Sequence, residues 1–341
     1  MEIKEVRLKE ELNSIKEFLS KNDLNYENSI DKTLYILDDD NIIASISKEK
    51  NVIKCLAVDE KYRSDNIAST IVSQMINFMY QDGIYHIMVY TKKIYELLFT
   101  SLNFKKIIST DKTVILEQGT PDINTVLSQI RHQVESQFNI NVMDEKINAI
   151  VLNASPFTNG HLYLVEEARK TCDYLIVFLL EEDKSFYTFK ERLALAYLAT
   201  QCFGNVIVIP STCYIISNLT FPTYFIKEEN TKNHEWMLTD ALIFNEYFKK
   251  ALNIKYRYVG TESDPVMKLY NETLKEVLKD NLIEIDRLDS ISASKVRSKV
   301  KDGMIDDALI YIPEAIKQMM RMISREKTSH EWYSKCPWRK S

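Results

Sequence analysis

The sequence predicts an α/β protein with two domains, the second of which is built on a parallel sheet. Its 341 residues, 45% of them apolar, are enough for two or three hydrophobic cores. Residues 1–117 alternate apolar runs with helical patterns. Residues 146–180 show an apolar run, a tight loop, a helical pattern and a second apolar run. This order predicts two parallel strands joined by a helix.

The first domain is expected to cover residues 1–117. The expected strands lie at residues 33–37, 42–47, 51–58 and 84–90, and the first two are separated by the turn-forming sequence D-D-D-N. The expected helices lie at residues 8–19, 67–79 and 95–102. Helical spacing places Ile67, Ile71 and Met75 on one face of the second helix, which therefore has an apolar side.

Residues 118–145 are expected to connect the domains. Gly119 and Pro121 mark a linker, and the apolar spacing that follows predicts a helix that packs between the domains. The second domain is expected to span residues 146–325. Residues 326–341 form a polar tail outside it.

The loop after the first strand of the second domain is the main candidate for a binding site. It reads N-A-S-P-F-T-N-G-H from Asn153 to His161, at the carboxyl end of a strand, where open α/β sheets bind ligands. Gly160 has no Cβ, so a ligand could approach its backbone closely. Gly160 and His161 would open a helix whose free N–H groups attract phosphate. A helix-capping loop with one partly buried histidine remains the alternative.

Two further stretches of the second domain carry polar residues. Strands are expected at 174–180, 205–210 and 282–286, and one or two helices at 306–320. A charged segment, 181–192, follows the second strand. The apolar and aromatic segment 213–227 follows the third strand. It is interrupted, as the wall of a pocket would be, by Ser217, Asn218, Thr220 and Thr223.

Composition argues against several classes of protein. The 44 basic and 49 acidic residues are well mixed and give a net charge of −5, so no nucleic-acid partner is expected. Charged residues interrupt each apolar run well short of a membrane span, and the amino terminus does not resemble a signal peptide. The five cysteines are scattered, which predicts reduced thiols in a cytoplasmic protein without a zinc site.

Two motifs far apart in the sequence resemble the HxGH nucleotidyltransferase superfamily. They are T-x-G-H, with Thr158 and His161, and I-S-A-S-K-V-R, with Arg297. That superfamily cleaves ATP between the α- and β-phosphates on a Rossmann-like sheet. The resemblance implies that Thr158 and His161 face the triphosphate, while Ser292, Ser294 and Arg297 hold phosphates from the opposite side. Thr158 stands where many members carry a first histidine.

The charged segment 181–192 is similar to another part of that superfamily. The resemblance implies that Lys184 reaches the phosphates and that F-x-E-R, ending at Arg192, starts the next helix. Two roles remain open for Arg192, which would either orient this helix or contact ATP.

The first domain resembles the GNAT acetyltransferases. In that family the sequence R/Q-x-x-G-x-G/A binds the pyrophosphate of coenzyme A, and the matching residues here are Arg63, Asn66 and Ala68. Asn66 replaces the first glycine, and Asn103 replaces a glycine usual in the closing turn. The alternative is a structural domain without a ligand.

The combination of motifs resembles one family more closely, the citrate lyase ligases, over residues 1–325. The additional matches are Y-I-I-S-x-x-T-F-P-x-Y-F from Tyr214, Y-V-G-T-E from Tyr258 and V-M-K-L-Y-N from Val266, and the GNAT-like domain precedes them as in that family. This resemblance implies that Thr158, His161, Lys184 and Arg297 are catalytic. The ATP-binding residues that it implies are Asn153, Ala154, Ser155, Pro156, Phe157, Gly160, Gly260, Thr261, Glu262, Ser292 and Ser294.

The resemblance also implies a reaction. Acetate and ATP would form an acetyl-adenylate and pyrophosphate, with Mg²⁺ accompanying ATP. The thiol of a phosphoribosyl-dephospho-CoA group, carried by the acyl carrier subunit of citrate lyase, would then take the acetyl group and release AMP. The sequence shows no closed carboxylate cage for the metal, so ATP is expected to supply most of its ligands.

Four alternatives remain open at this stage. The protein could be a plain adenylyltransferase of the phosphopantetheine type. It could also be an acetyl-CoA-dependent acetyltransferase, an acetate ligase for another carrier such as that of malonate decarboxylase, or a non-catalytic binding module.

Overall fold

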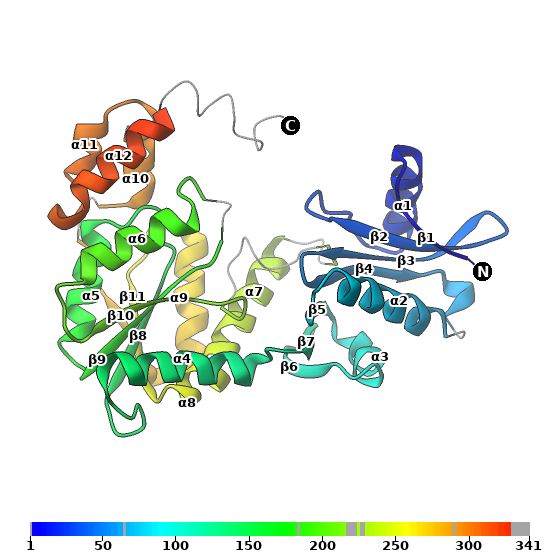
Figure 1. The fold of residues 1–341 in the computed structure, drawn as a ribbon, viewed down its shortest axis with the longest axis horizontal. Helices are drawn as coiled ribbons and strands as arrows, with labels where there is room; N and C mark the ends of the chain where they lie inside the picture. The colour runs from blue at the N-terminus through cyan, green and yellow to red at the C-terminus, as the bar shows by residue number, and fades with distance from the viewer. Residues whose placement is uncertain are drawn as a thin grey trace. The chain divides into compact units, whose positions relative to one another are not determined.

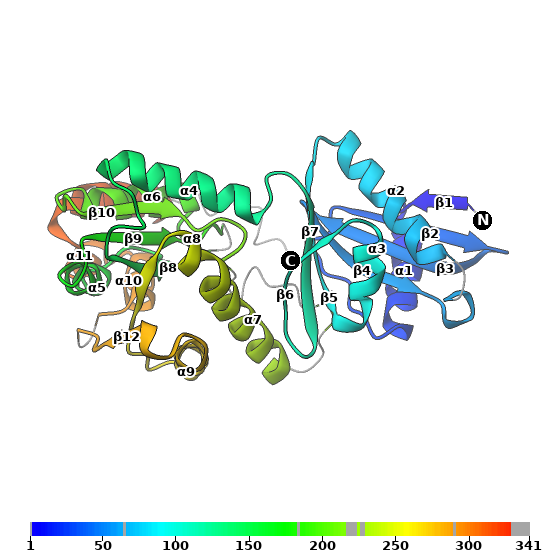
Figure 2. The ribbon, with the colours of Figure 1, turned by 90° about the horizontal axis from the view of Figure 1, so that it is seen from below.

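The computed structural model describes residues 2–63, 66–182, 185–215, 224–225, 229–288 and 291–328. By its contacts the chain divides into two compact units (Figures 1 and 2). The first unit combines Met1–Val126 with Thr220–Ile243, and the second combines Leu127–Leu219 with Phe244–Ser341. Each unit contains one sheet, so the predicted α/β class is confirmed.

The first unit contains a seven-stranded mixed sheet in the order β1-β2-β3-β4-β5-β7-β6. Its strands are β1 (Glu2–Glu5), β2 (Lys32–Asp38), β3 (Asn41–Glu49), β4 (Val52–Val58), β5 (His86–Lys92), β6 (Lys105–Ser109) and β7 (Thr113–Gly119). Neighbouring strands are antiparallel except β4 and β5, which are parallel. The four predicted strands are present. The short polar strand β1 and the β6–β7 hairpin were not predicted.

The helices of the first unit are α1 (Lys9–Lys21), α2 (Ile67–Gln81), α3 (Glu96–Ser101) and α7 (Glu229–Ile243). Helix α2 contacts β2, β3 and β4. Its residues Ile67, Ile71 and Met75 are buried, so the apolar face predicted from the helical spacing is confirmed. Helix α7 lies later in the sequence, yet it belongs to this unit, where it contacts β6.

The second unit contains a five-stranded sheet in the order β10-β9-β8-β11-β12, and all of its strands are parallel. They are β8 (Ile147–Leu152), β9 (Tyr174–Leu179), β10 (Val206–Pro210), β11 (Ile254–Gly260) and β12 (Leu282–Ile285). The chain adds β9 and β10 on one side of β8 and then places β11 and β12 on the other. The Rossmann-like parallel sheet implied by the resemblance is therefore present, and its order reverses between β8 and β11.

The helices of the second unit cover this sheet and add a carboxyl-terminal layer (Figure 1). They are α4 (Ile123–Phe138, which begins at the boundary between the units), α5 (Asn159–Arg169), α6 (Phe189–Thr200), α8 (Lys249–Ala251), α9 (Pro265–Leu278), α10 (Ala293–Lys301), α11 (Ile305–Leu309) and α12 (Lys317–Thr328). One core joins Val177 of β9 with Val165 of α5, Leu195 of α6 and Met320 of α12. The strands β8 and β9 are almost wholly buried, which explains their continuous apolar runs.

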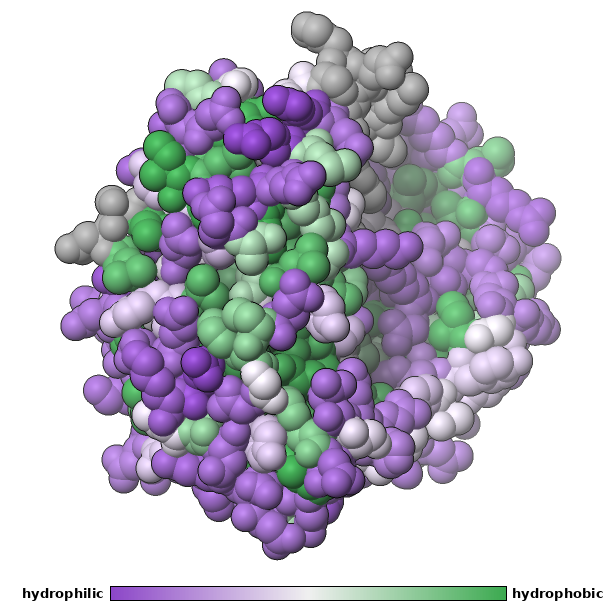
Figure 3. Space-filling view, turned by 60° about the vertical axis from the view of Figure 1, so that its left-hand side comes forward, coloured by the Kyte–Doolittle hydropathy of each residue, from purple (hydrophilic) through white to green (hydrophobic). Residues whose placement is uncertain are grey.

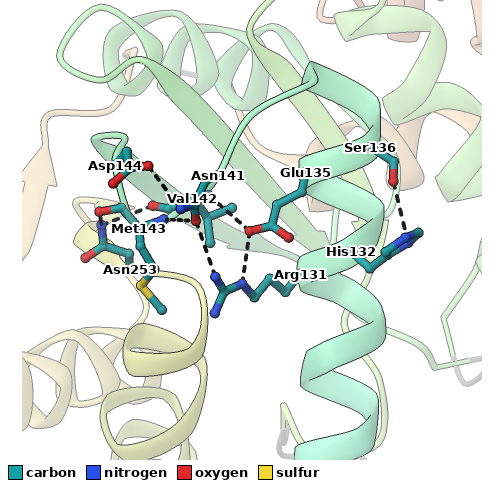
Figure 4. A network of polar contacts seen from close by, with 9 residues as sticks. All are labelled: Arg131, His132, Glu135, Ser136, Asn141, Val142, Met143, Asp144 and Asn253. Atoms are coloured by element: carbon teal, nitrogen blue, oxygen red, sulfur yellow. Dashed lines mark hydrogen bonds and ion pairs between the residues drawn. The ribbon is translucent and has the colours of Figure 1, made fainter.

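A polar network fixes the chain between α4 and β8 (Figure 4). Glu135 Oε1 accepts hydrogen bonds from Arg131 Nε at 3.0 Å and from the backbone N–H of Val142 at 3.2 Å. Asn253, which directly precedes β11, donates Nδ2 to the carbonyl groups of Val142, Met143 and Glu145 at 3.0–3.2 Å. The entry into β8 is thereby tied to the entry into β11.

On the face that Figure 3 shows, hydrophilic residues predominate and hydrophobic residues form smaller groups between them. Among the helices that the structure describes, none combines the length and apolar character needed to cross a membrane.

We predict that Asn253→Ala lowers the free energy of unfolding by about 2 kcal/mol, because it removes these hydrogen bonds and places alanine at a positive φ. Asn253→Gly serves as the matched control, since glycine adopts φ 51° without strain but also lacks the amide. Urea denaturation of both variants separates the two terms. Wild-type stability in Asn253→Ala would contradict the anchoring role.

Candidate functional site

The candidate site lies at the carboxyl edge of the second sheet. The strands are parallel, so the loops after β8, β11 and β12 all start from this edge. The order of the strands reverses between β8 and β11, and open α/β sheets bind ligands beside such a reversal. The loop from Asn153 and the stretch Gly260–Glu262 therefore start from the carboxyl ends of adjacent strands.

Thr158 and His161 are locked together at the start of α5. Thr158 is the N-cap residue, and both its backbone N–H, at 3.0 Å, and its hydroxyl oxygen, at 2.9 Å, contact Nδ1 of His161. A backbone N–H can only donate, so Nδ1 is an acceptor, and the proton of the neutral ring is on Nε2. His161 consequently holds an N–H donor beside the free N–H groups of a helix start.

The charge state of His161 follows from its surroundings. Burial and, to a lesser degree, the positive charge of Arg287 lower the pKa of His161 to about 4. The ring is therefore neutral at pH 7, and it lies against Phe157 with 5.5 Å between ring centroids. A neutral histidine in this tautomer donates a hydrogen bond without first having to gain a proton.

The loop that precedes α5 has a fixed and strained shape. Ala154 is buried and has φ 48°, a conformation that costs an L-residue with a Cβ about 1–2 kcal/mol. The fully buried Arg192 of α6 donates Nη1 to the carbonyl oxygen of Asn153 at 2.7 Å. It also donates Nε to Tyr187 O at 3.3 Å and Nη2 to Glu182 O. These bonds hold the start of α6 against the loops after β8 and β9, so of its two open roles they favour orienting this helix.

The motif that ends at Arg297 contacts the loop that precedes α5. Arg297 of α10 donates Nη1 to the carbonyl oxygen of Ser155 at 2.6 Å. Ser292 is the N-cap residue of α10, where its Oγ accepts from Lys295 N at 3.2 Å and lies 3.0 Å from Ser294 Oγ. The starts of α5 and α10, which the sequence placed far apart, are therefore adjacent.

Gly160 lies at this meeting point. A Cβ added to Gly160 would lie 3.6 Å from Ile291 Cγ2 and 3.6 Å from Thr158 Oγ1, which are ordinary van der Waals contacts. The packing of the protein alone therefore does not require glycine here. A ligand that approaches the backbone closely would explain why this position carries glycine.

Sequence reasoning missed Arg287, which follows β12. Its backbone N–H donates to Thr261 Oγ1 at 3.0 Å, and its Nη2 forms an ion pair with Glu262 Oε1. A Cβ at Gly260 would lie 3.5 Å from Arg287 Cγ, so the side chain covers the end of β11. Burial raises the pKa of Glu262. The available signal was the position of Arg287, just past the carboxyl end of a strand of this sheet.

The structure thus brings most of the predicted residues to one edge. They are Asn153, Ala154, Ser155, Pro156, Phe157, Thr158, Gly160, His161, Gly260, Thr261, Glu262, Ser292, Ser294 and Arg297. Arg63, Asn66 and Ala68 belong to the other unit, at the start of α2. Lys184 lies outside the described residues, as do Ser217, Asn218, Thr220 and Thr223.

The chemistry of this edge suits a phosphorylated ligand. Two guanidinium groups, those of Arg287 and Arg297, and the N–H donor of His161 accompany two helix starts. Guanidinium groups and helix N-termini both favour phosphate oxygens. No group of three or more His, Cys, Asp or Glu residues suited to a metal ion occurs within the described part of the chain.

Comparison with known proteins finds relatives that cover most of the chain. Residues 147–320 match the family described as citrate lyase ligase C-terminal domain. The citrate (pro-3S)-lyase ligase of Escherichia coli (strain K12) is 34% identical over 83% of this chain and 82% of its own length. A phosphopantetheine adenylyltransferase of Clostridium botulinum is 29% identical over 38% of this chain and 85% of its own length.

Solved structures match a smaller part of the chain. The crystal structure of an acyl-CoA N-acyltransferase from Pseudomonas aeruginosa matches 35% of this chain and 100% of its own length. The TM-score is 0.31 and the sequence identity 8%.

The lowered pKa of His161 predicts a pH dependence of stability. Between about pH 6.5 and pH 4 the unfolded chain binds a proton at this ring that the folded chain does not. The free energy of unfolding should therefore fall as the pH decreases through this window. His161→Gln should show a shallower fall in urea denaturation from pH 7.5 to 4.5.

The exposed His132 provides the control for this measurement. His132→Gln should retain the wild-type slope. Identical slopes in the wild type and in His161→Gln would contradict the assignment of a neutral, partly buried ring.

Proposed function

Because this chain belongs to the citrate lyase ligase family, we propose that it is an ATP-dependent ligase that acts on citrate lyase. Acetate would attack the α-phosphate of ATP, giving acetyl-adenylate and pyrophosphate. The thiol of the phosphoribosyl-dephospho-CoA group on the acyl carrier subunit would then take the acetyl group, and AMP would leave. The observation that carries the proposal is the meeting of the Thr158–His161 and Ser292–Arg297 motifs beside the switch between β8 and β11.

The residues of this edge suit adenylation better than proton transfer. Acetate is already ionised at neutral pH, so its attack needs no general base. It needs an in-line position and positive charge on the phosphates, where negative charge grows in the transition state. A neutral His161 supports this view, because its Nε2–H donates to a phosphate oxygen while its Nδ1 is occupied by Thr158.

Each predicted residue has a role in this scheme. One N–H group of Arg297 is bonded to the carbonyl oxygen of Ser155, and its remaining N–H groups are proposed to bind phosphate. Lys184 is proposed to approach the same phosphates. Ser292 and Ser294 offer hydroxyl groups at the start of α10. The loop Asn153–Phe157, Gly160 and Gly260–Glu262 are proposed to line the nucleotide. Mg²⁺ would enter with ATP and neutralise part of the triphosphate charge.

The decisive test is acetate-dependent exchange of labelled pyrophosphate into ATP. Only an enzyme that adenylates acetate reversibly is expected to show it. Exchange that requires phosphopantetheine in place of acetate would identify an adenylyltransferase. Acetyl transfer from acetyl-CoA without ATP would identify an acetyltransferase, and no activity with any of these would favour a binding module.

The identity of the carrier protein needs a separate assay. Acetate transfer should be measured to the purified acyl carrier subunits of citrate lyase and of malonate decarboxylase, each carrying its thiol arm. The arm contains a pyrophosphate, and the exposed Arg63, together with Asn66 and Ala68 at the start of α2, is proposed to contact it. Arg63→Ala should weaken transfer to the carrier and leave pyrophosphate exchange unchanged.

His161→Ala should lower the rate of pyrophosphate exchange by roughly 100-fold, because one preorganised donor to the developing phosphate charge is lost. His132→Ala, at an exposed position of α4, is the matched control and should exchange at the wild-type rate. Near-normal exchange by a folded His161→Ala protein would remove His161 from the catalytic residues.

Arg297→Lys should be impaired by about tenfold or more in the same assay. An ammonium group cannot hold the Ser155 carbonyl and a phosphate at once in the geometry of the planar guanidinium fork. Arg321→Lys, on the exposed face of α12, conserves charge in the same way and should be silent. Unaltered ATP affinity and rate in Arg297→Lys would show that Arg297 only anchors the loop.

A further inference from the structure

The sheet of the first unit contains an opening between β4 and β5. These parallel strands pair only at Val52 with Met88 and at Ile53 with Val89. Beyond this point residues 54–58 of β4 do not pair with residues 90–92 of β5. Cys55 has φ 53°, and the pairing of β4 with β3 shifts register beside it. We call this unpaired stretch the β4–β5 opening.

Tyr224 occupies the β4–β5 opening, although it lies far away in the sequence. Its side chain is 4% exposed, and its hydroxyl donates to the carbonyl oxygen of Tyr90 on β5 at 2.7 Å. Burial raises the pKa of Tyr224 well above its usual value, so the phenol keeps its proton and remains a donor. The hydroxyl is therefore held by the main chain of β5, beyond the point where β4 pairs with it.

The backbone beside Tyr224 is held as well. The carbonyl oxygen of Tyr224 accepts a hydrogen bond from the backbone N–H of Asn25 at 2.9 Å. Phe225 is buried next to it, and the two rings pack edge to face with 4.9 Å between centroids. The side chain and the main chain of Tyr224 are thus bound into the first unit, and Phe225 packs against the Tyr224 ring.

A second attachment follows on α7. Glu235 is 3% exposed, and its Oε2 accepts from Thr110 Oγ1 at 2.6 Å and from Thr113 Oγ1 at 2.8 Å, at the turn of the β6–β7 hairpin. Trp236 and Met237 beside it are buried. A buried carboxylate with two hydroxyl donors is a specific contact, since burial without them would be costly. Tyr224, Phe225 and α7 are therefore an integral part of the first unit.

The β4–β5 opening is also the place where an extended ligand would pair with this sheet. Unpaired strand edges bind chains with amide groups by forming main-chain hydrogen bonds. The arm of acetyl-CoA contains such amides. In this chain the carbonyl oxygen of Tyr90 is already bonded to Tyr224, and the space next to it contains a phenol ring.

We propose that the β4–β5 opening is the docking site of this chain's own Tyr224 and Phe225, and that it is closed to the arm of acetyl-CoA. The first unit then holds the chain that follows β10, and it performs no acetyl transfer through this opening. This inference does not depend on acetate being the substrate of the second unit.

Hydrogen exchange of the full-length chain tests the docking. Tyr224→Ala should speed exchange about tenfold or more in peptides covering residues 52–58 and 86–92, and lower Tm by roughly 5 °C. Tyr224→Phe keeps the ring and loses one hydrogen bond, so it should cause a smaller change in the same peptides. Tyr197→Ala, at an exposed position of α6 in the second unit, is the control and should leave both peptides unchanged. Wild-type exchange in Tyr224→Ala would overturn the proposal.

Acetyl-CoA provides an independent test that needs no variant. If Tyr224 fills the β4–β5 opening, adding acetyl-CoA to the wild-type protein should leave exchange in residues 52–58 and 86–92 unaltered. Protection of both strands by acetyl-CoA would overturn the proposal, because the arm and Tyr224 cannot occupy the same place. This measurement and Tyr224→Phe remain decisive if Tyr224→Ala does not fold.

Discussion

The candidate site depends on one buried guanidinium group. Arg192 joins the loops after two neighbouring strands through the carbonyl oxygens of Asn153, Glu182 and Tyr187. Burying a cation is costly unless its donors are satisfied, so these carbonyl groups are confined to positions that suit the fork. With Asn153 fixed, Ser155 presents its carbonyl oxygen to Arg297, and Thr158 caps α5. The shape of the loop before α5 thus follows from a residue of α6.

Local patterns in the sequence were sufficient for much of this unit. The apolar runs of β8 and β9 predicted buried parallel strands. The resemblance of the motifs at His161 and Arg297 implied that they share one ligand, and the structure joins the two stretches through Arg297 and Ser155. Arg287 escaped because no motif contains it. Arg287 reaches the candidate site because the carboxyl end of β12 lies next to that of β11. This neighbourhood depends on the order of the strands in the sheet and cannot be read from the local sequence. Lys184 stays a prediction.

The first unit was harder to predict for the same reason. Strand β1 has the polar sequence E-I-K-E and forms only because β2 offers a free edge. Helix α7 follows a strand of the second sheet, so its position along the chain assigned it to the second domain. Its buried residues, among them Glu235, instead fit Thr110 and Thr113 of the first unit. The spacing of apolar residues identifies the apolar face of a helix, but it does not show which other element packs against that face.

This arrangement makes the first unit depend on a segment from the middle of the chain. The chain enters the first unit between β10 and β11 and leaves it again after α7. Removing residues 1–117 would uncover Tyr224, Trp236 and Met237, and it would leave the Glu235 carboxylate without its hydroxyl donors. A loss of activity on truncation would therefore report the loss of packing as much as any role in binding a carrier. Point substitutions such as Arg63→Ala, which leave the β4–β5 opening filled, separate these two causes because Arg63 is exposed and outside that packing.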